Sequence, residues 1–483
     1  MAPDPPKPSD HDGGMETCAV VGASGYVGGR LIGHLVEHDD TVIALGRHLD
    51  RLPAIAERRQ VDVADTKATT SALTGVETAY YLVHSMAGNR DFSSRDRSLA
   101  QSFATSAARA GVRRIVYLGG LGHGELSDHL RSRQEVGQAL ASAGVEVVEL
   151  RAAMVIGAGS ISFEMLRYLT ERLPLMICPR WIKTRIQPIA EADLLRYLDQ
   201  ARRVPPGVYE IGGPAATTYR DMIATYAAVR GLRTRRIFDV PALTTGLSAR
   251  WVDLVTPVDR RVSHALIESL ATEVVVRDAA PAAAAFDVAP IGVVDAIRAA
   301  LDDQAARVPR ALMSFNAGLR HGVYSMRSHA RLDAKDTQAA RDDLDRCGGD
   351  LDWYGLPWAW RLRILAGRLF GERLQLSRPR TVERGATVDW WRVEEKTVDT
   401  LVLGTTEWFC GEAWLGYRIS ESPASQVQQV GALRPKGLLG LAYWRVLWPV
   451  HLAVFRIMCH RQSRRAHVLG RQHADEQRGG NRV

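Results

Sequence analysis

Three glycines spaced three residues apart, Gly22, Gly25 and Gly28, separate a short apolar run from a segment with apolar residues at helical spacing. This pattern predicts a strand, a tight turn and a helix. Glycines in such a turn let the backbone approach a bound diphosphate closely, and the start of the helix offers that diphosphate unpaired N–H groups. An ordinary glycine-rich turn is the alternative interpretation. The other loop residues expected at a nucleotide are Ser24, Tyr26 and Val27.

The second predicted strand covers residues 41–45, and the side chain that follows it distinguishes between nicotinamide cofactors. An acidic side chain there binds the adenosine ribose hydroxyls of NAD, whereas a cation suits the 2′-phosphate of NADP. The sequence has Arg47 at this place and Arg51 one turn later. It therefore favours NADP(H) over NAD(H), unless Arg47 is only a surface charge.

Short apolar runs alternate with helical segments throughout this half of the chain, at residues 60–63, 78–83 and 114–118. The alternation predicts an α/β fold with a doubly wound parallel sheet of the Rossmann type. Ligands of such sheets bind outside the carboxyl ends of the strands. The further residues expected along that edge are Asp62, Val63, Val83, His84, Ser85 and Gly119.

Several longer phrases resemble the atypical short-chain dehydrogenase/reductases, in particular the NmrA-like and nucleoside-diphosphate-sugar-epimerase-like proteins. These phrases are G-x-x-G-x-x-G, Tyr80–Met86, Arg114–Gly122, Leu130–Gly137 and Leu150–Gly157. The resemblance covers residues 16–303 and implies a Rossmann fold, bound NADP(H) and a smaller substrate lobe after Leu150. In that lobe Glu191 and Asp193 are expected to satisfy free N–H groups at a helix start rather than to act as acids.

The sequence departs from this family at the catalytic positions. Active members use a Tyr-x-x-x-Lys pair with a serine, and here His129 and Arg133 stand in place of the pair, with Gly119 or Gly120 in place of the serine. His129 can act as an acid or base near neutral pH, and Arg133 can orient the nicotinamide ribose without moving protons. Loss of the reductase chemistry is the alternative. The candidate catalytic residues are His129, His84 and Ser85, and His84 has the alternative role of a structural or cofactor contact.

The composition changes beyond residue 305, because nine of the eleven tryptophans lie after Leu351. The expected order is a strand at 323–332, helices at 336–347 and 358–370, strands at 387–395, 400–406, 413–419 and 426–432, and a long helix at 438–461. This order is that of the START-like helix-grip fold, an α+β domain. The predicted domains are a disordered leader (1–15), the Rossmann domain (16–305), the START-like domain (306–465) and a basic disordered tail (466–483). The end of the second domain also resembles a family of unknown function that is often fused to these reductases.

The predicted last helix carries an apolar stripe. It consists of Leu441, Trp444, Trp448, Leu452, Phe455 and Met458. Core packing explains such a stripe, and the wall of a cavity for an apolar ligand such as a quinone, lipid or polyketide is the alternative. Arg445 and His451 lie on or near this face. They either contact the polar end of that ligand or pair with Glu394, Glu395 or Glu407.

Composition limits the partners. The five cysteines lack C-x-x-C spacing, which argues against a disulfide framework and a zinc site, and no metal is expected. The net charge of +8 and the basic tail indicate either a solvated tail or peripheral contact with an anionic membrane, and nucleic acid is not expected. The apolar segment 437–459 is interrupted by Arg445, Pro449, His451 and Arg456, so no clear membrane span is predicted. We expect a cytoplasmic protein, with the inner membrane face as the alternative location.

Two functions fit these observations. The first is an NADP-dependent oxidoreductase whose hydrophobic substrate is held by the second domain. The second is a non-catalytic NADP(H)-binding sensor or assembly factor, which follows from the missing Tyr, Lys and Ser. A lipid carrier residing wholly in the second domain is a third, weaker hypothesis.

Overall fold

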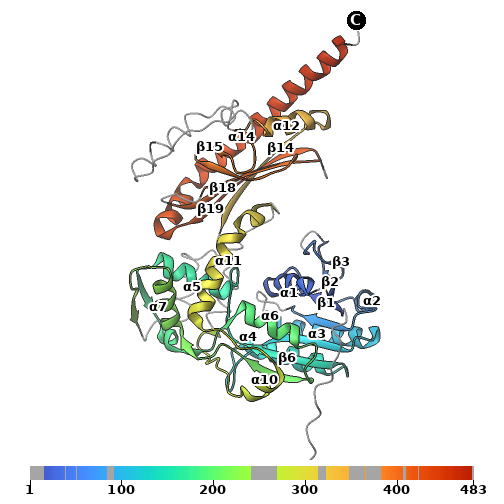
Figure 1. Ribbon diagram of the computed structural model, residues 1–483, viewed down its shortest axis with the longest axis vertical. Coiled ribbons are helices and arrows are strands. Elements are labelled where there is room, and N and C mark those ends of the chain that lie inside the picture. Colours follow the sequence, from blue (N-terminus) through green and yellow to red (C-terminus); the bar gives the residue numbers. More distant parts are fainter. Residues whose placement is uncertain are drawn as a thin grey trace, which may run out of the picture. The chain divides into compact units, whose positions relative to one another are not determined.

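The computed structural model describes residues 16–38, 40–49, 52–83, 92–240, 269–313, 323–347, 365, 382–405, 410–421 and 424–480. The chain divides into two compact units, and the second begins at Asp302 and also takes in short segments of the first half. We describe each unit by itself (Figure 1). His84, Ser85 and nearly all of the helix expected at 358–370 lie outside the described residues.

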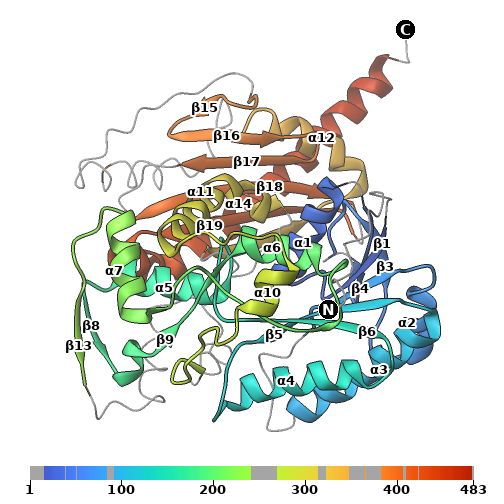
Figure 2. The same cartoon turned by 60° about the horizontal axis from the view of Figure 1, so that its bottom comes forward.

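The first unit is built on a seven-stranded, fully parallel sheet (Figure 2), which confirms the predicted Rossmann-like architecture. The strand order is β11-β6-β5-β4-β1-β2-β3. The sheet reverses its winding direction at β1, which pairs with β2 on one side and β4 on the other. The strands are β1 (Thr17–Val21), β2 (Thr41–Gly46), β3 (Glu57–Gln60), β4 (Thr78–Tyr81), β5 (Arg114–Gly120), β6 (Glu146–Ala152) and β11 (Gly207–Ile211).

Helices cover both faces of this sheet, because alternate strand residues point to opposite sides. Cys18 and Val20 of β1 pack in one core with α1 and α6, and Ala19 and Val21 pack in the other core with α3 and α4. Both faces of β1 are therefore apolar, as expected for a central parallel strand. The flanking helices are α1 (Tyr26–Glu37), α2 (Thr66–Ala72), α3 (Phe92–Ala110), α4 (Asp128–Ala141), α6 (Glu191–Gln200) and α10 (Ala280–Ala285).

The segments after β6 form a smaller group of elements at the position predicted for a substrate lobe. Short strands pair there in three two-stranded sheets, β10-β7, β12-β9 and β13-β8. The strands are β7 (Val155–Ile156), β8 (Leu175–Cys178), β9 (Arg185–Ile186), β10 (Ile189–Ala190), β12 (Thr217–Thr218) and β13 (Arg236–Asp239). The helices are α5 (Ile161–Arg172), η2 (Arg180–Lys183), α7 (Tyr219–Val229) and α11 (Val293–Met313), and the last residues of α5 and α11 belong to the second unit.

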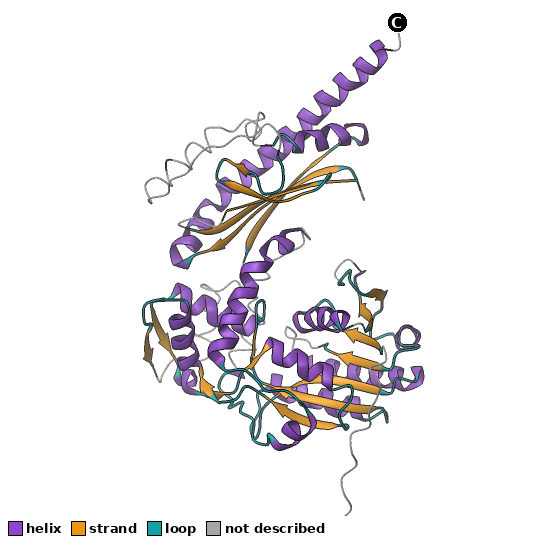
Figure 3. Ribbon diagram, in the orientation of Figure 1, coloured by secondary structure: helices purple, strands orange, loops and turns teal. Residues whose placement is uncertain are grey.

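The second unit has a six-stranded antiparallel sheet, order β14-β19-β18-β17-β16-β15, with the long helix α14 against it (Figure 3). The strands are β14 (Tyr324–Arg331), β15 (Thr387–Val388), β16 (Trp391–Lys396), β17 (Thr400–Thr405), β18 (Gly411–Ser420) and β19 (Gln426–Pro435). The helices are η4 (Ala334–Asp336), α12 (Thr337–Leu344) and α14 (Gly437–Gly480). The described elements follow the predicted order, except that the strand expected at 387–395 is two antiparallel strands, β15 and β16. One face of the sheet forms a core with α12 and α14.

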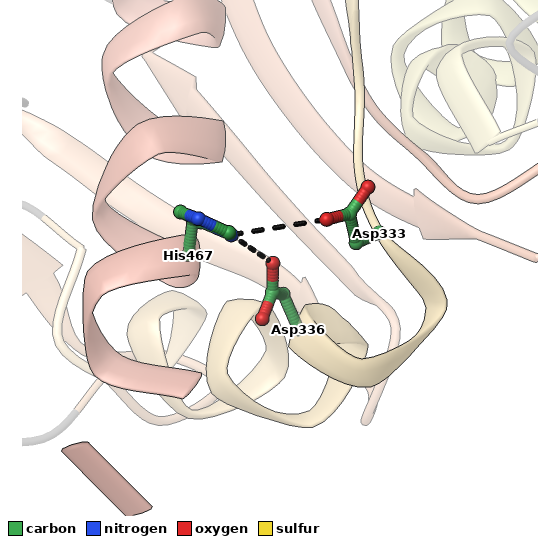
Figure 4. Close-up of side chains that lie close together, drawn as sticks. All are labelled: Asp333, Asp336 and His467. Atoms are coloured by element: carbon green, nitrogen blue, oxygen red, sulfur yellow. Dashed lines mark hydrogen bonds and ion pairs between the residues drawn. The ribbon is translucent and has the colours of Figure 1, made fainter. Parts of the chain in front are cut away.

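Helix α14 is longer than the sequence predicts, because it continues through residues 466–480, where we expected a disordered tail. Two buried aspartates hold this part of the helix. Arg465 pairs with Asp343 at 2.9 Å, and the His467 ring lies 2.7 Å from a carboxylate oxygen of Asp336 (Figure 4). Ligand atoms of Asp333, Asp336 and His467 lie within 4.8 Å of one another. Since the His467 ring nitrogen already contacts Asp336 directly, we interpret the group as a side-chain contact that joins η4 to α14.

Candidate functional site

The glycine-rich turn has the geometry that the sequence predicts. Gly22 has φ +89°, and a Cβ there would lie 2.6 Å from the carbonyl oxygen of Leu82. A Cβ on Gly28 would lie 2.9 Å from the carbonyl carbon of Gly22. The Gly25 N–H donates a hydrogen bond to Gly22 O at 2.9 Å, and Gly25, without a side chain, precedes the first residue of α1. Larger residues would therefore force the turn apart or cover the start of the helix.

This turn lies at the point where the sheet changes its winding direction. Val21 pairs with Leu45 on β2 and with Tyr81 on β4, so Gly22 follows β1 between the carboxyl ends of those two strands. Open α/β sheets bind their ligands in the crevice at this point. The start of α1 adds N–H groups and partial positive charge to it.

Arg47 follows β2 on the same edge. Its side chain is exposed, and its backbone carbonyl accepts a hydrogen bond from the Gln60 amide at 3.0 Å. Its guanidinium forms no ion pair with any described residue. Asp62 is also exposed, and its carboxylate accepts a hydrogen bond from the Ala64 N–H at 3.1 Å, while Val63 is half-buried. These residues follow β2 and β3, which pair Gly46 with Gln60, so they share the edge where the adenosine end of a dinucleotide is expected.

A buried carboxylate occupies the space beside Gly119. A Cβ on Gly119 would lie 2.6 Å from Glu149 Oε1, and Gly137 of α4 borders the same carboxylate. Glu149 is almost fully buried, burial raises its pKa, and Arg151 Nε donates to it at 2.7 Å. The Glu149 carboxylate, on the face of the sheet that α4 covers, therefore occupies the place where a side chain on Gly119 would lie. A serine does not fit there without displacing Glu149.

His129 and Arg133 lie near the start of α4, at the carboxyl edge of the sheet. The Arg133 guanidinium donates to the Leu118 carbonyl, and its Cδ would lie 3.2 Å from a Cβ on Gly120. Burial, together with the charge of Arg133, lowers the pKa of His129 to about 4. His129 is therefore neutral at pH 7, where it can donate or accept a hydrogen bond but carries no proton to give as a strong acid.

The structure reveals a contact that the sequence analysis missed. The Tyr26 hydroxyl donates a hydrogen bond to Glu191, and Arg30, one turn further along α1, pairs with the same carboxylate at 2.6 Å. Burial and the carboxylate raise the pKa of Tyr26. Gly157 borders both groups and leaves space for them. The expected role of Glu191 is thus incomplete: it lies in the first turn of α6, as expected, and its carboxylate also binds Tyr26 and Arg30 of α1.

Asp193 also differs from the expectation of a simple helix-start residue. It is fully buried, and its carboxylate accepts a hydrogen bond from the Ile291 N–H at 2.8 Å and pairs with Arg196. For the Glu191 contacts, the sequence signal is the Tyr-x-x-x-Arg spacing of residues 26–30, which places both side chains on one face of α1.

The second unit buries a row of neutral polar side chains. Ser328, Gln429 and Tyr417 are direct cross-strand partners on β14, β19 and β18, so they share one face of the sheet. Met458 of α14 lies over this row, with its sulfur 3.8 Å from the Gln429 amide nitrogen, and Gln462 follows one turn later. Ser328 Oγ, Gln429 Oε1 and both amide atoms of Gln462 are buried without a hydrogen-bond partner among the described residues. Buried polar atoms of this kind are normally satisfied by protein, water or a ligand.

The predicted stripe of α14 is mainly core. Leu441, Trp444 and Met458 are buried, and Leu452 and Phe455 pack against the same core, whereas Trp448 is 39% exposed. The His451 ring stacks on Phe455, and burial lowers the pKa of His451 to about 4. Arg445 is exposed, and Glu407 lies outside the described residues.

Comparison with protein families gives one match in each half of the chain. Residues 22–153 match the family described as NAD(P)H-binding, and residues 320–458 match the family described as protein of unknown function, DUF2867. Uncharacterized proteins of Mycobacterium tuberculosis and Mycobacterium bovis are 26% identical over 207 residues, which is 43% of this chain and 23% of theirs. The chain thus aligns with less than a quarter of the length of these relatives.

Solved structures resemble the first unit. Triphenylmethane reductase of Citrobacter sp. has a TM-score of 0.49 and 15% identity, over 60% of this chain and all of that one. The enzyme WbmH of Bordetella bronchiseptica, in complex with NAD+, has a TM-score of 0.46 and 14% identity, over 61% of this chain and 99% of that one. The chain therefore carries a region that matches the NAD(P)H-binding family, within the unit built on the parallel sheet, and a C-terminal region that matches the DUF2867 family.

Proposed function

We propose that the first unit binds NADP(H) and uses it to reduce a hydrophobic small molecule. The observation that carries this proposal is the glycine turn at the start of α1, with the exposed Arg47 at the end of the neighbouring strand β2. The turn suits a diphosphate, and a guanidinium without a protein partner among the described residues suits the 2′-phosphate that distinguishes NADP from NAD.

The chemistry at the other end of the cofactor limits the substrate class. NADPH transfers a hydride to an electrophilic atom of the substrate, and the substrate oxygen that gains the negative charge then needs a proton. His129 is neutral and Arg133 keeps its proton, so neither is a strong acid here. A quinone fits such a site, because hydride addition at one of its carbonyl oxygens makes that oxygen a hydroxyl and leaves the other as a phenolate. The conjugate-acid pKa of a phenolate is near about 10, so water protonates it readily. A simple ketone yields a far more basic alkoxide and needs a protein acid.

The second unit is proposed to retain the hydrophobic molecule in a helix-grip arrangement of its sheet and α14. The buried row of Ser328, Gln429 and Gln462 supports this role, because its donors and acceptors suit a hydroxyl or carbonyl oxygen in apolar surroundings. The row carries no net charge, so an uncharged polar end of the ligand is favoured over a carboxylate.

Calorimetry with NADPH and NADH tests the cofactor assignment. We expect NADPH to bind about 10- to 100-fold more tightly, the range of a charged hydrogen bond worth about 1.5–3 kcal/mol. Arg47→Ala should bring the two affinities close together, while Arg58→Ala, an exposed arginine in the middle of β3, should leave the preference intact. Equal affinity of the wild-type protein for both cofactors would contradict the NADP assignment.

NADPH consumption against quinones, enones and aldehydes tests the reaction. Turnover of quinones but not of aldehydes is expected, and no turnover of any of them despite measured NADPH binding would contradict the reductase proposal.

A non-catalytic NADP(H) sensor is the second candidate. It is favoured by the replacement of the tyrosine and lysine by a neutral histidine and an arginine. In that case NADPH and NADP+ should alter the affinity of the protein for a hydrophobic ligand or protein partner without being consumed. Partner binding that ignores the cofactor would exclude this candidate.

A further inference from the structure

Helix α14 has an unusual composition over its first 35 residues. Gly437–Arg471 contains six arginines and no aspartate or glutamate. Among the described residues this is the helix that is long and apolar enough to cross a membrane by length and composition, and 17% of its most apolar window is buried. A helix that only completed a soluble core would bury its apolar residues.

The two faces of α14 have different surroundings. Leu441, Trp444 and Met458 pack into the core of the second unit, as the sheet-facing side of an amphipathic helix should. The opposite face is also apolar in its first part, where large side chains are between 42% and 73% exposed. They are Leu438, Leu439, Val446, Val450 and Ile457. At 100° per residue these positions form one stripe.

Basic residues extend this stripe toward the C-terminus. Arg456, His460, Arg464 and Arg471 are exposed and fall on the same side of the helix as Val446 and Val450. The exposed face is therefore apolar for five turns and basic for the next three, and it carries no acidic residue as far as Arg471. Its charge is complementary to an anionic surface.

We propose that this exposed face of α14, which we call the α14 stripe, docks on an anionic lipid membrane. The apolar part enters the boundary between headgroups and acyl chains, and the arginines contact lipid phosphates. The helix lies in the plane of the interface instead of crossing it, because its other face is packed on the sheet and its later turns are tied to Asp336 and Asp343.

A second copy of this chain fits the stripe less well. Two stripes packed in parallel would bring their arginines together with no acid between them, and two packed antiparallel would set the arginines of each against the apolar part of the other. Neither arrangement pairs the charges, and like charges across an interface cost affinity. An anionic membrane instead offers a binding free energy of about 1 kcal/mol per basic residue near its surface.

Vesicle binding of the full-length protein tests the proposal. We expect sedimentation with vesicles containing 30% phosphatidylserine at lipid concentrations at least about tenfold below those needed with phosphatidylcholine alone. Arg456→Ala with Arg464→Ala should weaken binding to the anionic vesicles about 25-fold, the product of two fivefold losses. Val446→Glu with Val450→Glu should abolish it. Val398→Glu changes a side chain that is 69% exposed but lies outside α14, and should leave binding unchanged.

A site-specific probe separates docking from a loss of folding. The five native cysteines are buried, so a fluorophore on Val450→Cys or Val398→Cys labels a single exposed thiol in the native protein. An environment-sensitive dye should brighten at position 450 and not at 398 when anionic vesicles are added. Equal brightening at both positions, or equal binding to both kinds of vesicle, would overturn the proposal. The stripe would be assigned to a second copy of the chain by a different pair of results. The wild-type protein would form a dimer and not bind vesicles, and the double substitution Val446→Glu with Val450→Glu would dissociate that dimer.

Discussion

The Tyr26 hydroxyl donates a hydrogen bond to the carboxylate of Glu191, which joins the first residue of α1 to the first residue of α6 across 165 residues of sequence. Arg30 holds the same carboxylate, and Gly157 leaves room for both side chains. The contact fixes the end of the glycine-rich turn to a second helix. The turn is thereby held in its shape before any nucleotide binds.

The first prediction concerns this contact. Tyr26→Phe should lower the free energy of unfolding by about 1–2 kcal/mol, because a charged hydrogen bond in a mostly buried place is lost. Hydrogen exchange of the α1 amides should become faster. The double variant with Glu191→Ala should show a coupling of about 1 kcal/mol between the two positions. Additive effects would mean that the two side chains act independently.

The second prediction uses two glycines of the same helix. A Cβ on Gly28 would collide with the Gly22 carbonyl group, whereas a Cβ on Gly33 meets no atom within 4 Å. Gly28→Ala should therefore distort the turn and reduce NADPH affinity at least about tenfold. Gly33→Ala should leave affinity unchanged and stabilise α1 by up to about 1 kcal/mol, because alanine is the better helix former. Equal affinities of the two variants in calorimetry would show that the turn does not hold the cofactor.

The sequence predicts the features that depend on neighbouring residues. The turn at Gly22–Gly28 and the alternation of strands and helices follow from local spacing, and both are confirmed. The partners of Glu191 do not follow from local spacing, because the first turn of a helix is a common place for an acid and Tyr26 lies far away in the chain. Tyr26 and Glu191 fit together because Gly157 has no side chain and leaves space for them. The periodicity of apolar residues does not reveal such a space.

The length of α14 was missed for a similar reason. Arg465 and His467 look like part of a solvated basic tail, since no acid stands beside them in the sequence. Their partners, Asp343 and Asp336, are 122 and 131 residues earlier. A run of basic residues predicts a disordered tail only when no buried acidic residue pairs with it. Which acidic residues lie close to the run depends on the fold and cannot be read from the neighbouring sequence.

The third prediction tests the pairing of this basic run with a buried aspartate. Arg465 pairs with Asp343, which is 2% exposed, while its neighbour Arg464 is exposed. Arg465→Ala should destabilise the second unit by about 1–2 kcal/mol, because a buried carboxylate loses a charged hydrogen-bond donor that is itself partly exposed to solvent. Arg464→Ala should cost less than about 0.5 kcal/mol. Thermal unfolding of both variants gives the comparison, and equal melting temperatures would contradict the buried pair.

The last prediction is a pH dependence. The pKa of His129 is lowered from 6.5 to about 4 by burial and by Arg133. Between these values the unfolded chain binds a proton on His129 that the folded chain does not bind, so stability is complete above pH 6.5 and falls as the pH falls. By pH 5.5 the protonation of His129 in the unfolded chain should lower the free energy of unfolding by about 1.4 kcal/mol, the value of one pKa unit. His129→Gln should lose correspondingly less stability between pH 7.5 and pH 5.5, as measured by urea unfolding. A variant that loses as much stability as the wild type would mean that His129 is accessible to protons in the folded protein, which would restore it as a candidate acid for the reduction.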